Sequence, residues 1–179
     1  MSDLRPTPTL RRATAGDAVE ILRLFDEAIA WFVSVGNTGQ WGSEPATGQE
    51  RWEERATRWA AGPDTWIAQL PDTGEVCGAL VLGEALEYVP AATEPELYVQ
   101  TLIGSRDPRA KGTGRLLLAF AEQQAADRGL GLLRLDCYAG GTGDLVRYYE
   151  SVGFTPTETF RVGEWPGQVL TRRVPYSEE

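Results

Sequence analysis

A short basic segment with two glycines has the composition of a phosphate-binding turn. It occupies residues 109–114, between an apolar run at 97–103 that favours a strand and a helical pattern that includes Leu117 and Phe120. The first turn of a helix leaves backbone N–H groups unpaired and favours negative charge. Glycine lacks the Cβ that would keep a phosphate away from those groups. The sequence therefore predicts a pyrophosphate site made by Arg109, Ala110, Lys111, Gly112, Thr113, Gly114 and Arg115.

The spacing of this turn separates it from two other phosphate motifs. The dinucleotide-binding fingerprint requires Gly or Ala three residues after its second glycine, where this chain has Leu117. The nucleoside-triphosphate loop requires Lys directly after a glycine, whereas Lys111 precedes Gly112. The order Arg-x-x-Gly-x-Gly instead resembles the (Gln/Arg)-x-x-Gly-x-(Gly/Ala) turn of the GNAT superfamily of N-acetyltransferases, which binds the pyrophosphate of acetyl-coenzyme A. Taken alone, the segment is also compatible with a glycine turn that begins an ordinary helix.

A second helical pattern supports the resemblance. Four apolar or aromatic residues recur at i, i+3, i+4 and i+7 and predict one helix face: Leu145, Tyr148, Tyr149 and Val152. The sequence Tyr-Glu-Ser-Val-Gly-Phe at 149–154 resembles the Tyr-x-x-x-Gly-Phe signature that ends the GNAT core, and it follows a predicted strand at 132–137. Because both signatures occur in the family's order, the chain is identified as a member of the GNAT superfamily over about residues 10–174.

The resemblance implies an α/β fold built as one domain over residues 10–176, after a flexible tail at 1–9. Its central sheet is expected to be mixed but mostly antiparallel, flanked by helices, with the fourth and fifth strands splayed apart. The residue patterns match that order. Strands are predicted at 10–13, 65–70, 76–83, 97–103, 132–137, 159–162 and 169–174; helices are predicted from a Thr14–Asp17 capping box to about Val35, at 49–61, after the glycine turn and at the second signature.

The resemblance also implies which residues hold the coenzyme. In GNAT enzymes, backbone amides between the splayed strands bind the pantetheine arm and the acetyl carbonyl, a role that falls here on Leu102, Ile103 and Gly104. The chain departs from the family at two places. The usual Val-x-Pro is Gly-Ser-Arg at 104–106, and Thr142 stands where an asparagine often contacts the coenzyme. The bend of the strand end and the Thr142 contact are therefore open.

Tyr149 matches the family tyrosine that protonates the sulfur of coenzyme A. A phenol has a suitable strength to protonate a thiolate as it leaves, provided that it lies within hydrogen-bond reach. Tyr149 also lies on the apolar helix face, so that simple packing is the alternative. Tyr148 shares that face and is predicted to belong to the core.

The general base is less well defined by the sequence. Family members often carry a glutamate where this chain has Tyr98, and alternation along a strand points Glu96 to the same side. Glu96 is therefore the first candidate to deprotonate the acceptor amine, directly or through water, and Tyr98 is assigned to the acceptor side. Since the chain has no histidine, the other candidates are carboxylates; an acceptor that arrives neutral would need no base. These carboxylates are Glu84, Glu87 and Asp136.

The segments that enclose the acceptor in family enzymes are rich in tryptophan here. Those on the predicted helices are expected to pack in the core: Trp31, Trp52 and Trp59. Trp41 lies instead in a glycine-rich loop at 36–47, and Trp165 lies in a predicted hairpin turn at 163–167, each close to a glutamate. Because tryptophan faces attract cations, Trp41 and Trp165 are predicted to bind a small, cationic, partly apolar amine.

The composition sets bounds on the protein. A chain of 179 residues, 42% hydrophobic, suits one domain with a substantial core. No apolar run reaches membrane-spanning length and residues 1–10 contain no secretory hydrophobic region, which predicts a cytoplasmic protein. Cys77 and Cys137 form neither a disulfide framework nor a zinc pattern, so no metal is expected. The net charge of −9 disfavours nucleic acid as a partner and favours cationic substrates.

Two other classes of function also fit the sequence. One is a domain that binds acyl-coenzyme A without turnover, which the intact Tyr149 disfavours. The other is an acetyltransferase acting on a protein or aminoacyl-tRNA amine, and scattered arginines offer no evident basic surface for tRNA. Acetyl transfer from acetyl-coenzyme A to a small-molecule amine is the preferred function. The identity of the acceptor and the formation of a homodimer are left open.

Overall fold

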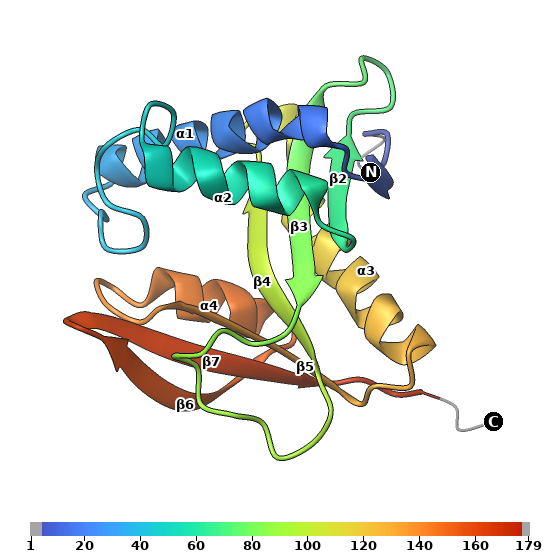
Figure 1. The fold of residues 1–179 in the computed structure, drawn as a ribbon, viewed down its shortest axis with the longest axis vertical. Helices are drawn as coiled ribbons and strands as arrows, with labels where there is room; N and C mark the ends of the chain where they lie inside the picture. The colour runs from blue at the N-terminus through green and yellow to red at the C-terminus, as the bar shows by residue number, and fades with distance from the viewer. Residues whose placement is uncertain (1–4, 177–179) are drawn as a thin grey trace. The chain divides into compact units, whose positions relative to one another are not determined.

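The computed structural model describes residues 5–176. Seven strands form one mixed sheet in the order β1-β2-β3-β4-β5-β7-β6, with helices flanking it (Figure 1). The strands are β1 (Thr9–Arg12), β2 (Thr65–Gln69), β3 (Val76–Gly83), β4 (Leu97–Gly104), β5 (Leu132–Tyr138), β6 (Thr155–Val162) and β7 (Trp165–Arg173). The helices are α1 (Ala18–Ser34), α2 (Glu50–Ala61), α3 (Thr113–Asp127) and α4 (Asp144–Ser151), with short 3-10 turns at Ala15–Asp17 and Pro108–Ala110. The predicted α/β fold with a mixed sheet is confirmed.

The fourth and fifth strands pair only briefly. They run parallel, and their partners are Leu97 with Leu133, Tyr98 with Arg134 and Val99 with Leu135. Both strands continue past this point, β4 to Gly104 and β5 to Tyr138. The other described pairs, β1–β2, β2–β3, β5–β7 and β6–β7, are antiparallel. The early end of the parallel pairing agrees with the predicted separation of these strands.

Two compact units divide the chain. The first contains the residues up to Thr38, Gly42–Val81 and Thr101–Leu117. In it, α1 and α2 lie side by side, and Phe25 of α1 contacts the rings of Trp52 and Trp59 at 4.7 and 5.7 Å between centroids (Figure 1). The prediction of core packing holds for Trp52 but not for Trp31, which is 36% exposed and lies under the Arg106 guanidinium.

Within residues 5–9, two positions contact the rest of the first unit. Thr9 already belongs to β1, and the Arg5 guanidinium donates to the Pro108 carbonyl at 2.7 Å. Residues 1–4 lie outside the described residues. The predicted capping box is present at the first turn, where the Thr14 amide donates to the Asp17 carboxylate at 2.7 Å.

The second unit contains Gly39–Trp41, Leu82–Gln100 and the residues from Leu118 onward. Its β6–β7 hairpin closes with Val162 paired to Trp165, so that only Gly163 and Glu164 form the turn. The two-residue turn lets β7 begin at Trp165, before its predicted start at residue 169, and so places Trp165 in β7 rather than in a loop. β6 ends at Val162 as predicted but begins earlier, at Thr155. On α4, Tyr148 is 40% exposed, and its predicted place in the core is therefore wrong.

Candidate functional site

The predicted phosphate turn connects β4 to α3 within the first unit. Gly112 has φ of +90°, a left-handed conformation that strains any other residue, and its carbonyl accepts from the Leu116 amide at 3.0 Å. A Cβ built on Gly104 would lie 3.8 Å from the Gly114 backbone nitrogen and would meet nothing else within 4 Å. The end of β4 therefore lies close to the amide of Gly114, in the first turn of α3, with no side chain at Gly104 to cover it.

Two side chains of the turn point inward and hold it in shape. Ala110 and Thr113 are 2% and 1% exposed, and the Thr113 hydroxyl donates to the Ala110 carbonyl at 2.6 Å. The Ala110 amide also donates to the Asp107 carbonyl at 2.8 Å, so these two residues shape the turn from inside. Lys111 is exposed, and within residues 5–176 no ion pair engages it.

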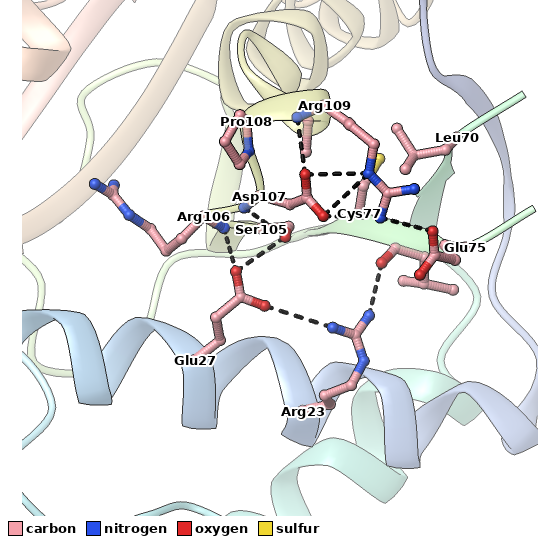
Figure 2. Close-up of a pocket in the computed structure, with 12 residues that line it drawn as sticks. Arg23, Glu27, Leu70, Glu75, Cys77, Ser105, Arg106, Asp107, Pro108 and Arg109 are labelled. Atoms are coloured by element: carbon pink, nitrogen blue, oxygen red, sulfur yellow. Dashed lines mark hydrogen bonds and ion pairs between the residues drawn. The ribbon is translucent and has the colours of Figure 1, made fainter. Parts of the chain in front are cut away.

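Arg109, the first cation of the turn, is already paired. Its guanidinium contacts Asp107 at 2.8 Å and Glu75 at 2.9 Å, as Figure 2 shows. The hydrogen bond to Arg109 lowers the pKa of the Asp107 carboxyl, and Asp107 followed by Glu75 raises the pKa of Arg109. The sequence predicts Arg109 as part of the pyrophosphate site, whereas in the structure its guanidinium pairs with Glu75 of the β2–β3 turn.

Helix α1 holds the segment that leads into the turn. Glu27 accepts hydrogen bonds from the Ser105 hydroxyl, at 2.9 Å, and from the Arg106 amide. Arg23 contacts Glu27 at 3.5 Å and donates to the Val76 carbonyl at 2.7 Å (Figure 2). These residues border an open cavity of about 430 Å³ lined by α1, the start of β3 and residues 105–110.

The sequence did not indicate these contacts of Glu27 and Glu75. Glu27 is a half-buried residue of α1 and Glu75 an exposed residue of the β2–β3 turn, and each meets the segment at 105–109 only through the tertiary fold. No local spacing joins positions so far apart in the chain.

Tyr149 lies in the second unit, half-buried on α4. Its ring contacts Phe154 and Tyr148 edge-on, at 6.1 and 5.3 Å between centroids. Among the described residues none forms a hydrogen bond with its hydroxyl. Burial is the main cause that raises the pKa of Tyr149, and the neighbouring Cys137, Tyr148 and Asp136 add to it. The phenol is therefore protonated at neutral pH and has a proton to donate.

Glu96 is the counterion of a buried arginine. Arg134 is 2% exposed and donates to both carboxylate oxygens of Glu96, at 2.9 Å to Oε1, and to the Pro90 carbonyl at 3.0 Å. Protonating Glu96 would leave the Arg134 charge buried without its partner, which is costly. The geometry therefore favours a structural role for Glu96 over the predicted one of general base.

Tyr98 is fully buried, at 0% exposure, and packs with Val89 and Val169. Its hydroxyl donates to Asp136 of β5. The prediction that Tyr98 contacts the acceptor is not supported, because no part of its side chain reaches the surface. Side-chain alternation did place it on the same side as Glu96, since Arg134 contacts both.

Trp165 holds the loop that carries Trp41. Its indole N–H donates to the Gly39 carbonyl at 2.9 Å, and the Gln40 side chain accepts from the Tyr138 amide at 2.7 Å. A Cβ on Gly39 would meet the Tyr138 ring at 2.1 Å, so only glycine fits there. The glycine-rich loop is thus anchored at residues 39 and 40, and both Trp41 and Trp165 are half-buried.

Thr142 stands just before α4 and is exposed. Its hydroxyl donates to the Asp144 carboxylate at 2.6 Å, which lowers the pKa of Asp144. The predicted contact of Thr142 with the coenzyme therefore remains a prediction.

Comparison with known proteins agrees with the fold and the motifs. A sequence model of the acetyltransferase (GNAT) family matches residues 24–154, so the chain belongs to that family. A search of curated proteins finds no significant match.

Many solved structures share the fold at low sequence identity. A GNAT-family acetyltransferase from Listeria monocytogenes superimposes with a TM-score of 0.66 at 18% identity, over 93% of this chain and 94% of that one. A phosphinothricin acetyltransferase from Sinorhizobium meliloti, solved with acetyl-coenzyme A, gives 0.61 at 18% over 94% and 89%. The ribosomal-protein-S18-alanine N-acetyltransferase of Escherichia coli gives 0.64 at 15% over 96% and 97%. At such identities the similarity establishes the fold alone.

The described residues, 5–176, offer neither a metal-binding cluster nor a membrane-spanning helix. No group of three or more His, Cys, Asp or Glu side chains there could hold a metal ion. No helix in the same range has the length and apolar character needed to cross a membrane.

Proposed function

We propose that the protein transfers the acetyl group of acetyl-coenzyme A to the amine of a small, cationic molecule. The observation that carries the proposal is the approach of Gly104 to the Gly114 amide, beside a glycine with φ of +90°. That arrangement offers backbone N–H groups to an anion without a side chain in the way. Membership in the GNAT acetyltransferase family supports acetyl-coenzyme A as the ligand.

The coenzyme's contacts follow from this assignment. The pyrophosphate binds the amides of residues 112–115, and Lys111 and Arg115 supply positive charge. The backbone of Leu102, Ile103 and Gly104 binds the pantetheine arm and the acetyl carbonyl. The Tyr149 hydroxyl gives its proton to the sulfur when the carbon–sulfur bond breaks. Arg109 joins the phosphate contacts if it leaves Asp107 and Glu75.

The acceptor is proposed from charge and aromatic content. The chain carries a net charge of −9, which disfavours polyanionic partners. Trp41 and Trp165 provide flat apolar faces that suit a cation, and Glu164 precedes Trp165 in the hairpin turn. The structural neighbours include phosphinothricin acetyltransferases, whose name gives a small-molecule acceptor and supports the small size proposed here but not the positive charge. The alternative acceptor is a protein N-terminus, as in the ribosomal-protein-alanine enzymes of the same fold.

The coenzyme site is tested by adding one methyl group. Gly104→Ala places a Cβ beside the Gly114 amide at an ordinary contact distance, so it should fold normally yet weaken acetyl-coenzyme A binding by at least about tenfold. Gly16→Ala is the matched control, because its Cβ meets nothing within 4 Å. Isothermal calorimetry gives both affinities. Equal affinity of Gly104→Ala and the native protein would show that the pyrophosphate binds elsewhere. Gly112 is a poorer test, since its φ of +90° strains any side chain.

The acceptor class is tested by release of free coenzyme A thiol. Agmatine, spermidine, tryptamine and phenethylamine represent small cationic amines, and a peptide with N-terminal alanine represents the alternative. The proposal expects turnover with at least one of the four amines and little with the peptide. Turnover of the peptide alone would replace the small-molecule acceptor with a protein one.

A further inference from the structure

We propose that Asp136 is the group that takes the proton from the acceptor ammonium, with Tyr98 as the residue that positions its carboxylate. The inference deepens the acetyl transfer proposed above and rests on it. Both residues belong to the second unit, and the sequence alone ranked Asp136 only among the alternatives to Glu96.

The position of Asp136 follows from the strand pairing. The parallel pairs of β4 and β5 end at Val99 with Leu135, so Asp136 is the first β5 residue beyond them. Its antiparallel partner on the other side is Val169 of β7. Asp136 therefore lies where β5 loses its neighbour on one side, while the strand remains held by β7.

The Asp136 carboxylate has one oxygen held and one oxygen open. Oδ1 accepts the Tyr98 hydroxyl, whose ring is fully buried and fixed by its packing. Among the described residues, none donates a hydrogen bond to Oδ2, and the side chain as a whole is partly exposed. A carboxylate fixed at one oxygen and open at the other can receive a proton in a defined direction.

The surroundings of Asp136 favour proton uptake. Burial is the largest effect and raises the pKa of Asp136, while the hydrogen bond from Tyr98 and the charge of Arg134 lower it less. The other titratable neighbours are Cys137 on β5 and Tyr149 on α4, whose own pKa values are raised by burial and by the nearby Asp136 charge. A carboxylate with a raised pKa is a stronger base than an exposed one.

Core packing alone gives no reason for a carboxylate here. An asparagine would accept the Tyr98 hydrogen bond without the desolvation of a charge. The pKa of Asp136 is raised in the folded state above its ordinary 3.8. As the pH rises, the Asp136 carboxyl therefore loses its proton in the unfolded chain before it does so in the folded protein. Folding stability therefore falls as the pH rises through the interval between the two pKa values and stays lower at pH 7. A group retained at a cost to stability is expected where activity needs it.

Asp136 takes one proton from the ammonium, and the neutral amine attacks the acetyl carbon to form a carbon–nitrogen bond. The tetrahedral intermediate breaks its carbon–sulfur bond, and Tyr149 gives a proton to the departing sulfur. The amide nitrogen sheds its second proton, which restores the Tyr149 hydroxyl through solvent. Asp136 then releases its proton to water. The net products are the acetamide, coenzyme A thiol and one proton.

The kinetic test compares Asp136→Asn with Glu96→Gln, using whichever of the four amines named above reacts fastest. We expect Asp136→Asn to lower kcat by about 10²-fold or more, with unchanged acetyl-coenzyme A affinity and a melting temperature at pH 7 no lower than that of the native protein. Glu96→Gln should instead lower the melting temperature, because Arg134 loses its buried partner. Glu158→Gln, an exposed change beside the same arginine, is the matched control and should alter neither. A native rate in Asp136→Asn, or the same rate loss in Glu96→Gln without unfolding, would overturn the proposal.

A second measurement separates this inference from the proposed function. Carbon-13 NMR of labelled aspartate carboxyls, assigned with Asp136→Asn, follows Asp136 without any acceptor. We expect its titration above the ordinary aspartate range, and a further upward shift in Tyr98→Phe, because the lost hydrogen bond no longer stabilises the charged form. Titration at or below the ordinary value would reject Asp136 as the base. That result would not affect the proposed coenzyme site, because calorimetry tests acetyl-coenzyme A binding at the turn independently.

Discussion

Tyr149, in the second unit, has a hydroxyl that can donate a proton and few contacts that would give it a structural role. The Tyr149 hydroxyl has no hydrogen-bond partner among the described residues, and its ring meets Phe154 and Tyr148 only through edge contacts. The raised pKa of Tyr149 keeps it protonated over the neutral range. A group in this state can donate a proton to a thiolate and then needs to be reprotonated by solvent.

Replacing that hydroxyl tests its role directly. Tyr149→Phe should lower kcat by about 10²-fold or more, while acetyl-coenzyme A affinity and melting temperature stay close to native, because no hydrogen bond is lost. Tyr148→Phe removes the same atom from the exposed neighbour and should leave the rate unchanged. Thiol-release kinetics and thermal unfolding measure both. A clear loss of stability with a near-native rate would assign Tyr149 to packing instead.

The sequence could predict which residue types the site contains, but not always their surroundings. Helical spacing placed Tyr148 and Tyr149 on one apolar face. In the structure, α4 has only eight residues, and Tyr149 is half-buried while Tyr148 is 40% exposed. Likewise, the sequence predicted Glu96 as a carboxylate on a strand. Its ion pair with Arg134 could not be predicted, because Arg134 belongs to β5 and lies 38 residues further along the chain. Ion pairs of this kind form between residues that are distant in the sequence, and no local sequence pattern indicates them.

At the scale of elements, hydrophobic periodicity and turn residues predicted the order of strands and helices well. The limits of β3 were predicted as observed, and those of β4 within one residue. The β6–β7 hairpin was predicted too short, because Gly163, Pro166 and Gly167 suggested a five-residue turn. In the structure Gly163 alone takes the left-handed conformation, with φ of +61°, and Gly167 is a buried strand residue against Phe160.

The phosphate turn depends on an element that the motif does not include. Glu27 of α1 accepts two hydrogen bonds from residues 105 and 106, and Arg23 ties it to the start of β3 (Figure 2). This network fixes the backbone just before the turn, so that the amides of the first α3 turn keep their positions.

Removing Glu27 should therefore affect the coenzyme more than the chemistry. We expect Glu27→Ala to weaken acetyl-coenzyme A binding about fivefold or more, corresponding to roughly 1 kcal/mol for hydrogen bonds that position the backbone, with kcat at saturation nearly unchanged. Glu20→Ala is the control, because Glu20 pairs with the same Arg23 on the exposed side. Calorimetry and saturation kinetics give the two quantities. If Glu27→Ala lowers stability while affinity stays native, Glu27 only supports the fold.

At the scale of the whole molecule, the negative net charge of the chain disfavours binding of the proposed anionic ligand. The chain carries a net charge of −9, whereas the pyrophosphate is an anion, so binding must come from the local amides and positive side chains of the turn. Of the 17 basic residues, 16 are arginines, and the single lysine is Lys111 in the turn. Because Asp107 and Glu75 engage Arg109, Lys111 is the exposed cation of the turn best placed to meet the phosphate.

A single lysine also makes the proposed site chemically addressable. Reductive methylation with formaldehyde should modify only Lys111 and the N-terminal amine, and mass spectrometry can follow the two separately. We expect saturating acetyl-coenzyme A to slow methylation of Lys111 by about tenfold, because the bound phosphate buries and pairs the ammonium. The N-terminal amine should react at the same rate with and without the coenzyme and serves as the internal control. Desulfo-coenzyme A, which keeps the pyrophosphate but cannot transfer acetyl, should protect equally well. Unchanged reactivity of Lys111 in protein that calorimetry shows to be saturated would exclude this lysine from the phosphate contacts.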